Sequence, residues 1–230
     1  GTAYTCRVAL TIGSFTDDNT VTTTFTPMGT AAQLVYTTQP SSSGAGVVLP
    51  NQPVVKIEDA NGNIVSAGPD STAVVTLTVA STSPTTGTVR GTSSVSAVSG
   101  VATFTGLNLQ EAGIKILTAT KADTSSQTNG SVALNQNSNQ FTISAGTVSP
   151  LFSTISISPA VPPSSPLVAN GSAAYTVNIA LADQYGNPIS GVKPTIISSI
   201  SGDTITQPTQ NTNGAALTAA SVSSPTADPS

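Results

Sequence analysis

The stretch Asp-Ala-Asn-Gly-Asn at residues 59–63, which recurs as Asp-Gln-Tyr-Gly-Asn at residues 183–187, decides the fold of this chain. In both copies the Asp side chain can accept hydrogen bonds from backbone N–H groups two residues on, and glycine takes a positive φ without steric cost. An alternating apolar run precedes each copy and an apolar pair follows it, so both are predicted to be turns between two strands. The residues that make these turns are Asp59, Gly62, Asn63, Asp183, Gly186 and Asn187.

The spacing of the two copies, 124 positions (183 minus 59), predicts two related β-domains in tandem. Short alternating runs separated by Gly, Pro, Ser and Asn clusters are typical of a two-sheet sandwich. No segment keeps a helical period for three turns, so essentially no helix is expected. The predicted fold is all-β, with tandem Ig-like sandwiches in an elongated rod. The runs in the first sandwich are residues 33–37, 54–58, 64–65, 74–79, 101–104, 114–119 and 140–143.

Four segments are predicted along the chain. Residues 1–28 form two strands around a turn at 13–19, residues 29–146 form the first sandwich, residues 147–151 form a short linker, and residues 152–230 form the second sandwich. The first segment resembles the C-terminal hairpin of a fibronectin type III domain, through its Gly-Thr-x-Tyr-Thr start and its Thr-Pro exit. The strands expected in the second sandwich are 154–158, 175–183, 192–197 and 215–222, with a last strand missing.

A second resemblance covers most of residues 152–224. The Asp-Gln-Tyr-Gly-Asn-Pro-Ile-Ser-Gly-Val run at 183–192, followed by Asn-Gly-Ala-Ala at 213–216, is similar to the bacterial Ig-like repeats of the intimin and invasin type. The first sandwich resembles a neighbouring class of bacterial surface repeats, with Gln39-Pro40 after its first strand and a Gly-Val-Ala-Thr-Phe run at 100–104. The motif residues are structural in these families, so the resemblance implies a scaffold and no active site.

The composition excludes several classes of function. Six Lys and Arg against ten Asp and Glu give a net charge of −4, and no basic cluster occurs, so neither nucleic acid nor an anionic membrane surface is an expected partner. No apolar run is long enough for membrane insertion. The chain contains no His, which removes the commonest general base and the Ser-His and Cys-His triads. Trp is absent, which argues against a sugar site. The chain is therefore not expected to be an enzyme.

Two loops are candidates for a calcium site. One offers oxygen atoms from Glu58, Asp59, Asn61 and Asn63, and the other from Asp17 and Asp18. Calcium requires about six to eight oxygen ligands, so either loop needs ligands from elsewhere. The preferred interpretation is an Asp side chain that caps its own turn, with no cofactor and calcium as the alternative.

The roles of the cysteine and of three lysines are left open by the sequence. Cys6 is the only cysteine, so no disulfide can close within this chain, and it is either a buried strand residue, half of a bridge to sequence outside the chain, or a reactive thiol. Lys56, Lys115 and Lys193 lie in strand-like runs and are candidates for a Lys–Asn isopeptide crosslink, known in some bacterial surface Ig-like domains. The alternation places Lys56 on the face opposite the apolar residues of its run.

The sequence therefore predicts a structural or adhesive segment of a large bacterial cell-surface or secreted protein, extracellular, with tandem domains that form a stalk. Its expected partners are neighbouring Ig-like domains of the same or an identical chain, and a host or surface receptor that the sequence does not identify. The alternative is a self-assembling protomer of a surface layer, sheath or filament joined by strand complementation, because the unfinished second sandwich leaves an edge that a neighbour's strand could fill. A weaker third interpretation is a domain of a virion.

Overall fold

The chain divides into two compact units. The computed structural model describes residues 10–12, 15–17, 29–122, 133–158, 174–197, 204–205 and 217–223. Unit 1 comprises Gly1–Ser42, Val48–Asn108 and Ile114–Phe141, and unit 2 comprises Ser43–Val47, Leu109–Gly113 and Thr142–Ser230. Two short segments that interrupt unit 1 in the sequence, 43–47 and 109–113, therefore belong to unit 2.

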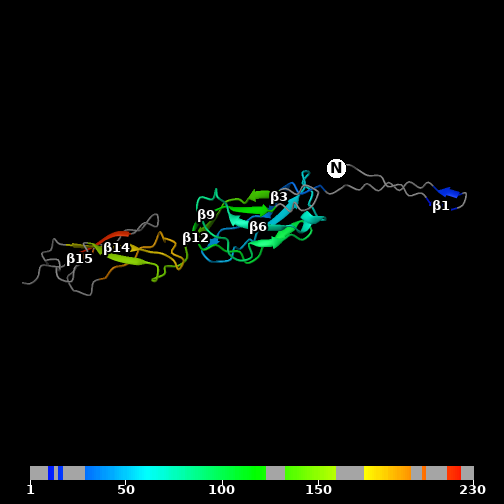
Figure 1. Cartoon of the computed structure of the whole chain (residues 1–230). Helices are drawn as coiled ribbons and strands as arrows, with labels where there is room; N and C mark the ends of the chain where they lie inside the picture. The colour runs from blue at the N-terminus through cyan, green and yellow to red at the C-terminus, as the bar shows by residue number, and fades with distance from the viewer. Residues whose placement is uncertain are drawn as a thin grey trace, which may run out of the picture. The chain divides into compact units, whose positions relative to one another are not determined.

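Unit 1 contains a two-sheet sandwich (Figure 1). The first sheet has the order β3-β5-β8, and the second has the order β11-β10-β6-β7, with all neighbours antiparallel. A single 3-10 turn, η1 (Pro69–Thr72), precedes β6. The strands are β3 (Gln33–Thr38), β5 (Val54–Glu58), β6 (Val74–Val79), β7 (Ser94–Ser96), β8 (Val101–Thr103), β10 (Leu117–Lys121) and β11 (Leu134–Asn137).

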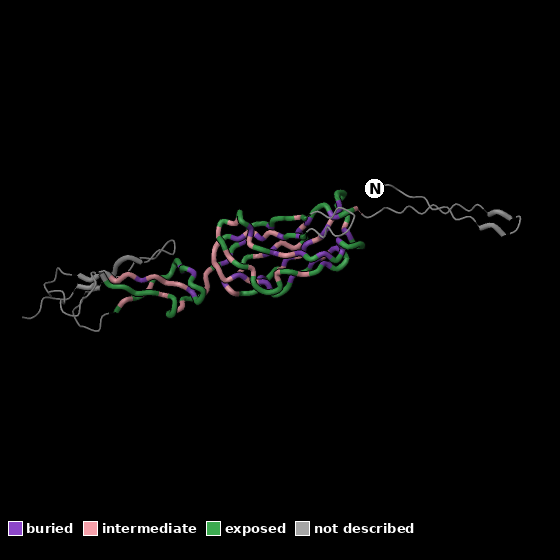
Figure 2. The backbone as a smooth tube through the Cα atoms, in the orientation of Figure 1, coloured by how far each residue is buried: buried purple, intermediate pink, exposed green. Residues whose placement is uncertain are grey.

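Alternation along the strands builds the core of this sandwich (Figure 2). Val55 and Ile57 of β5 are fully buried, whereas Lys56 between them is only half-buried. Because side chains alternate between the two faces of a strand, the apolar residues of both sheets meet in one interior. The Tyr36 hydroxyl of β3 donates to the Leu117 carbonyl of β10 at 3.3 Å, which ties one sheet to the other. Burial raises the pKa of Tyr36 well above its usual value of 10.0.

The remaining strands form three further sheets. A three-stranded sheet has the order β4-β12-β9, in which β4 runs parallel to β12. A four-stranded antiparallel sheet in unit 2 has the order β13-β14-β16-β15, and a hairpin pairs β1 with β2. The bounds are β1 (Leu10–Ile12), β2 (Phe15–Asp17), β4 (Ser43–Gly44), β9 (Gly113–Lys115), β12 (Phe141–Ser144), β13 (Thr154–Ser158), β14 (Ala174–Ala180), β15 (Thr204–Ile205) and β16 (Leu217–Ser223).

The all-β class predicted from the sequence is confirmed, since the described residues contain no α-helix. They also contain no helix of the length and apolarity that crossing a bilayer requires. The expected runs 54–58 and 74–79 are strands with those bounds, β5 and β6. The sequence analysis missed four short strands, β4, β7, β11 and β15. Three of them, β4, β7 and β11, have no buried residue, so no buried apolar alternation marks them.

Three strand predictions are wrong. Residues 192–197 form no strand, and Val192 and Ile197 are 38% and 86% exposed, so neither has a sheet to pack against. Residues 114–119 divide into β9 and β10 rather than one strand. The expected strand 64–65 is reduced to a single bridge from Ile64 to Glu58. The predicted turn at 13–19 is also misplaced, because Phe15–Asp17 is strand β2.

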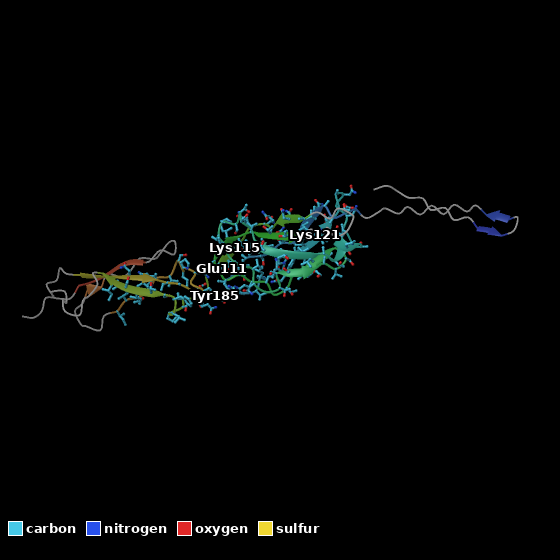
Figure 3. All side chains as sticks on the ribbon, viewed as in Figure 1. Glu111, Lys115, Lys121 and Tyr185 are labelled. Carbon is cyan, nitrogen blue, oxygen red and sulfur yellow. The ribbon has the colours of Figure 1, made fainter. Side chains whose placement is uncertain are left out.

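A buried ion pair joins η1 to β10 in unit 1. The Lys121 Nζ atom lies 2.9 Å from Asp70 Oδ1, and the two side chains are 0% and 11% exposed. The other carboxylate oxygen, Oδ2, accepts a hydrogen bond from the Ala31 backbone N–H at 3.3 Å. Figure 3 marks Lys121, whose strand also carries the core residues Leu117 and Ala119. The pair therefore anchors the start of the sandwich to its central strands.

Replacing Asp70 by Ala is expected to destabilise unit 1 by about 3–5 kcal/mol, because the charge on Lys121 would remain buried without its partner. Urea denaturation of the parent and the variant measures this change. The Asp70→Ala/Lys121→Met double variant removes both charges and is expected to recover part of the loss. Equal stability of the parent and Asp70→Ala would contradict a structural role for the pair.

Candidate functional site

The turn at 59–63 is held by one carboxylate. Asp59 Oδ1 accepts hydrogen bonds from the backbone N–H groups of Asn61 and Asn63, both at 2.9 Å, and Oδ2 accepts one from Asn63 Nδ2 at 3.3 Å. The Asp59 N–H donates to the Asn63 carbonyl at 2.9 Å, and the Gly62 N–H donates to the Asp59 carbonyl at 3.1 Å. Gly62 has a φ of 82°, a conformation that costs glycine nothing.

The turn at 183–187 repeats these bonds atom by atom. Asp183 Oδ1 accepts from the N–H groups of Tyr185 and Asn187 at 2.8 and 2.9 Å, and Oδ2 accepts from Asn187 Nδ2 at 2.8 Å. The Asp183 N–H donates to the Asn187 carbonyl, and the Gly186 N–H donates to the Asp183 carbonyl, both at 3.0 Å. Gly186 has a φ of 81°.

Each carboxylate also binds a glycine that precedes strands of its own unit. The Gly146 N–H donates to Asp183 Oδ2 at 2.8 Å, and the Gly29 N–H donates to the Asp59 carboxylate. Each carboxylate therefore accepts four N–H donors, three from its turn and one from a glycine that lies far away in the sequence. The approach is closest at Gly29, where a Cβ atom would lie 2.7 Å from Asp59 Cβ.

Three residues after each of these glycines, the backbone N–H donates a hydrogen bond to the carbonyl of the residue before the turn's Asp. The Ala32 N–H donates to the Glu58 carbonyl, and the Ser149 N–H donates to the Ala182 carbonyl, both at 2.8 Å. Glu58 and Ala182 each directly precede the Asp of their turn. The two turns are thus repeated together with the segments that they hold.

Hydrogen bonding lowers the pKa of both carboxyl groups. For Asp59 the largest effect is the backbone N–H of Asn63, which favours the charged form and outweighs the opposing effect of burial. For Asp183 burial is the largest single effect and raises the pKa. The hydrogen bonds from Asn187, Gly146 and Tyr185 together exceed it, so the pKa lies below its usual value of 3.8. Both groups are therefore charged at neutral pH.

In unit 2 the second turn also binds the loop segment 109–113. Asn187 Nδ2 donates to the Gln110 carbonyl at 2.6 Å, and Asn187 Oδ1 accepts from the Ala112 N–H at 2.8 Å. Asn187 is 9% exposed, so these bonds are shielded from water. We refer to residues 43–47, 109–113 and 183–187 as the turn–loop cluster.

An aromatic contact completes the turn–loop cluster. Gly46 lies against the ring of Tyr185, because a Cβ atom built on Gly46 would be 2.0 Å from the Tyr185 hydroxyl oxygen. Gly46 has a φ of 74°, and its N–H donates to the Leu109 carbonyl at 2.7 Å. Tyr185 is 37% exposed and is labelled in Figure 3. The second turn thus contacts both loop segments through Tyr185 and Asn187.

The candidate calcium ligands occupy different positions. Glu58 ends β5 and accepts from Gln33 Nε2 at 3.2 Å, while Asp17 ends β2 and Asp18 lies outside the described residues. The described part of the chain holds no group of three or more Cys, Asp or Glu side chains placed to bind a metal ion. Four N–H donors already bind the Asp59 carboxylate. Calcium at this turn stays the untested alternative to a carboxylate that caps its own turn.

The lysine candidates lie in different parts of the chain. Lys115 is fully buried, and its Nζ atom donates to the Thr85 hydroxyl at 2.8 Å and to the Thr86 carbonyl. Lys56 lies on β5, and Lys193 lies in the segment that forms no strand. Cys6 is outside the described residues. The isopeptide crosslink stays a prediction.

One open groove lies elsewhere, in unit 1. It has a volume of about 310 Å³ and is lined by residues 76–79 of β6 and by Gly87, Thr88, Val89 and Ser93. None of these side chains is an acid or a base at neutral pH. The groove therefore offers no general acid or base for catalysis.

Sequence reasoning missed the two glycines that the carboxylates bind and the loop partners of Asn187. A weak signal for the glycines was present, because the dipeptide Gly-Thr occurs at 29–30 and again at 146–147 before the first strand of each sandwich. The partners of Asn187 left no such signal, because a backbone carbonyl and N–H can belong to any residue type.

Comparison with known proteins gives two structural matches. No model of a protein family matches the sequence, and no curated protein matches it. The crystal structure of invasin, a bacterial integrin-binding protein, matches with a TM-score of 0.38 and 16% identity, over 85% of this chain and 34% of that one. The Escherichia coli adhesin FdeC matches with a TM-score of 0.38 and 20% identity, over 85% of this chain and 57% of that one.

The chain spans about a third of the length of invasin and just over half of that of FdeC.

The Gly29→Ala variant is expected to lose about 1–3 kcal/mol of stability, because the new methyl group would overlap Asp59 at 2.7 Å. Gly146→Ala is the matched control, since its Cβ atom would lie 3.5 Å from Asp183 Oδ2 in ordinary contact. Urea denaturation of both variants measures the difference. Equal losses would show that Gly29 is not tightly packed against the carboxylate.

Acid is expected to weaken both turns. Because the folded-state pKa of Asp59 and Asp183 lies below the usual 3.8, their contribution to stability is complete above that value and is lost as pH falls through the folded pKa. The urea midpoint should therefore stay level from pH 7 to about 5 and decrease below about pH 4. Asp183→Asn should show a shallower decrease, and an identical slope in the two proteins would refute the assignment.

Removal of calcium is expected to leave the melting temperature unchanged. The Asp59 carboxylate already accepts four N–H donors, and a calcium ion would have to displace them. Calorimetric melting with EDTA and with excess calcium tests this. A higher melting temperature in calcium, abolished by Asp59→Asn, would establish a site at this turn.

Proposed function

We propose that the chain is a structural and adhesive segment of a bacterial cell-surface or secreted protein, in which tandem Ig-like sandwiches form a stalk. The observation that carries the proposal is the repeated carboxylate. In each unit an Asp at a strand end binds the segment that enters the sandwich, through Gly29 at Asp59 and Gly146 at Asp183. A module that fixes its own entry segment is suited to be joined in series with others.

The composition supports a passive scaffold rather than an enzyme. The chain has no His, and charged residues make up only 7% of it, so few groups can transfer protons or bind metal ions. Its sandwich is stabilised by apolar burial and by backbone pairing between strands. The adhesive part of the proposal, and the extracellular location at a bacterial surface, come from the resemblance of residues 152–224 to intimin and invasin repeats.

Small-angle X-ray scattering of the 230-residue chain tests the stalk. A compact domain of this length has a radius of gyration of ~17 Å, and tandem sandwiches in series should give a clearly larger value. Labelling of intact source cells with an antibody against the chain tests its location. A radius near that of one compact domain, or no labelling of intact cells, would count against the proposal.

Self-assembly by strand complementation remains the second candidate, and one observation favours it. The edge strand β13 carries Ile155 and Ile157, which are 71% and 48% exposed. An apolar edge strand is a surface on which another strand can pair. Light scattering of the purified chain separates the two candidates: a mass of 22.7 kDa that does not change with concentration supports the stalk, and growing polymers support assembly.

A further inference from the structure

The two equivalent asparagines differ in what they contact. Asn187 is buried and uses both ends of its side-chain amide on the segment 109–113. Asn63 occupies the same position in the first turn but is exposed, and its Nδ2 atom reaches only Asp59, at 3.3 Å. Within the described residues, Asn63 Oδ1 has no hydrogen-bond partner. In the part of the chain that the structure describes, the first turn therefore presents a copy of this group that binds no loop.

The way in which Asn187 binds does not depend on the side chains of its partner. It donates to the carbonyl of residue 110 and accepts from the N–H of residue 112, two backbone groups of one short segment. A side-chain amide has one acceptor oxygen and a donor NH2 group, so it can complement a backbone C=O and N–H at the same time. Asn63 has the same chemistry and could bind any loop that offers this pair.

The segments that enter the two turns are also alike. β12 (Phe141–Ser144) leads into Gly146, and it pairs with β4 (Ser43–Gly44), directly before the loop that touches Tyr185. β12 ends two residues before Gly146, and it therefore lies in one sheet with β4, which belongs to the turn–loop cluster. Gly29 stands in the corresponding place before the first turn, because it donates to the Asp59 carboxylate and lies three residues before the Ala32 N–H that donates to the Glu58 carbonyl.

We propose that the turn at 59–63 is a docking surface for the loop end of an Ig-like sandwich that precedes Gly29 in the polypeptide. Asn63 binds a backbone carbonyl and N–H of that loop, as Asn187 does in the turn–loop cluster. Asn61 stands where the second turn has Tyr185, so the partner loop meets a short polar side chain and needs no glycine equivalent to Gly46. The proposal rests on the tandem arrangement under Proposed function and names the surface that joins its members.

A graft within the existing chain tests whether the first turn can bind such a loop. The variant Gln184→Ala/Tyr185→Asn/Pro188→Ile makes residues 183–188 identical to residues 59–64. NMR measures hydrogen exchange of the Asn187 side-chain NH2 group, with Asn63 in the same spectrum as the exposed reference. In the parent, Asn187 should exchange at least about tenfold more slowly than Asn63.

The grafted chain should keep this slow exchange to within about threefold, because the atoms that bind residues 110 and 112 are unchanged. Exchange of Asn187 at the rate of Asn63 would overturn the proposal, since the sequence of the first turn would then be unable to hold the loop. Folding is not at risk, because the first turn already forms with these residues in unit 1.

A second chain tests the docking directly. Residues 1–28 are replaced by a copy of residues 29–145, which places a sandwich immediately before Gly29. Exchange of the Asn63 side-chain NH2 should slow at least about tenfold relative to the parent. Ala112→Pro in the added copy removes the N–H donor and should restore fast exchange, whereas Ala112→Gly keeps the donor and should not. Fast exchange of Asn63 in the tandem chain, with the added copy folded, would overturn the proposal.

These measurements separate the docking surface from the proposed function. They report on one side chain and do not depend on where the chain is located or on what it adheres to. A compact scattering profile or an intracellular location would refute the stalk and leave the exchange results intact. Fast exchange of Asn63 in the tandem chain would refute the docking surface alone.

Discussion

The structure depends on a carboxylate that accepts four N–H groups at the end of a strand. A carboxylate is the side chain that suits this position, because it has two acceptor oxygens and no donor, whereas an asparagine would bring an NH2 group against N–H donors. Three of the four donors close the turn locally, and the fourth comes from the entry glycine. One side chain thereby fixes both the exit of a strand and the start of the sandwich.

The position of the Asp59 carboxylate is determined by the strand that precedes it, which is paired on both sides. β5 is the central strand of its sheet, with neighbours on both sides and with Val55 and Ile57 fully buried. Asp59 follows this strand directly, so its position is determined by the core of the sandwich. Gly29 is then held against a side chain whose position the core determines.

The sequence predicted the strands and turns that neighbouring residues form, but not the hydrogen bonds between residues far apart in the chain. The bounds of β5 and β6 were predicted correctly, because the buried face of each strand carries alternating apolar residues: Val55 and Ile57 in β5, and Val75 and Leu77 in β6. The polar strands β7 and β11 carry no such pattern, and Pro194 interrupts the apolar run at 192–197 that was expected to be a strand. The bond from Gly146 to Asp183 joins residues 37 apart, and that from Asn187 to Gln110 joins residues 77 apart. The repeated Gly-Thr dipeptide is the one sequence signal for the first bond, and no pattern in the sequence indicates the second.

The two turns also show which positions are free to change. Asp, Gly and Asn are the same in both copies, since a carboxylate, a positive φ and a side-chain amide are each required. The hydrogen bonds of the turn use only the backbone N–H of the third position and no side chain of the second or third, so Ala60 and Asn61 in one copy can be Gln184 and Tyr185 in the other. Tyr185 uses this freedom to pack on Gly46. The same turn geometry is therefore kept while the side chains at its two variable positions are free to make other contacts, as Tyr185 does in the turn–loop cluster.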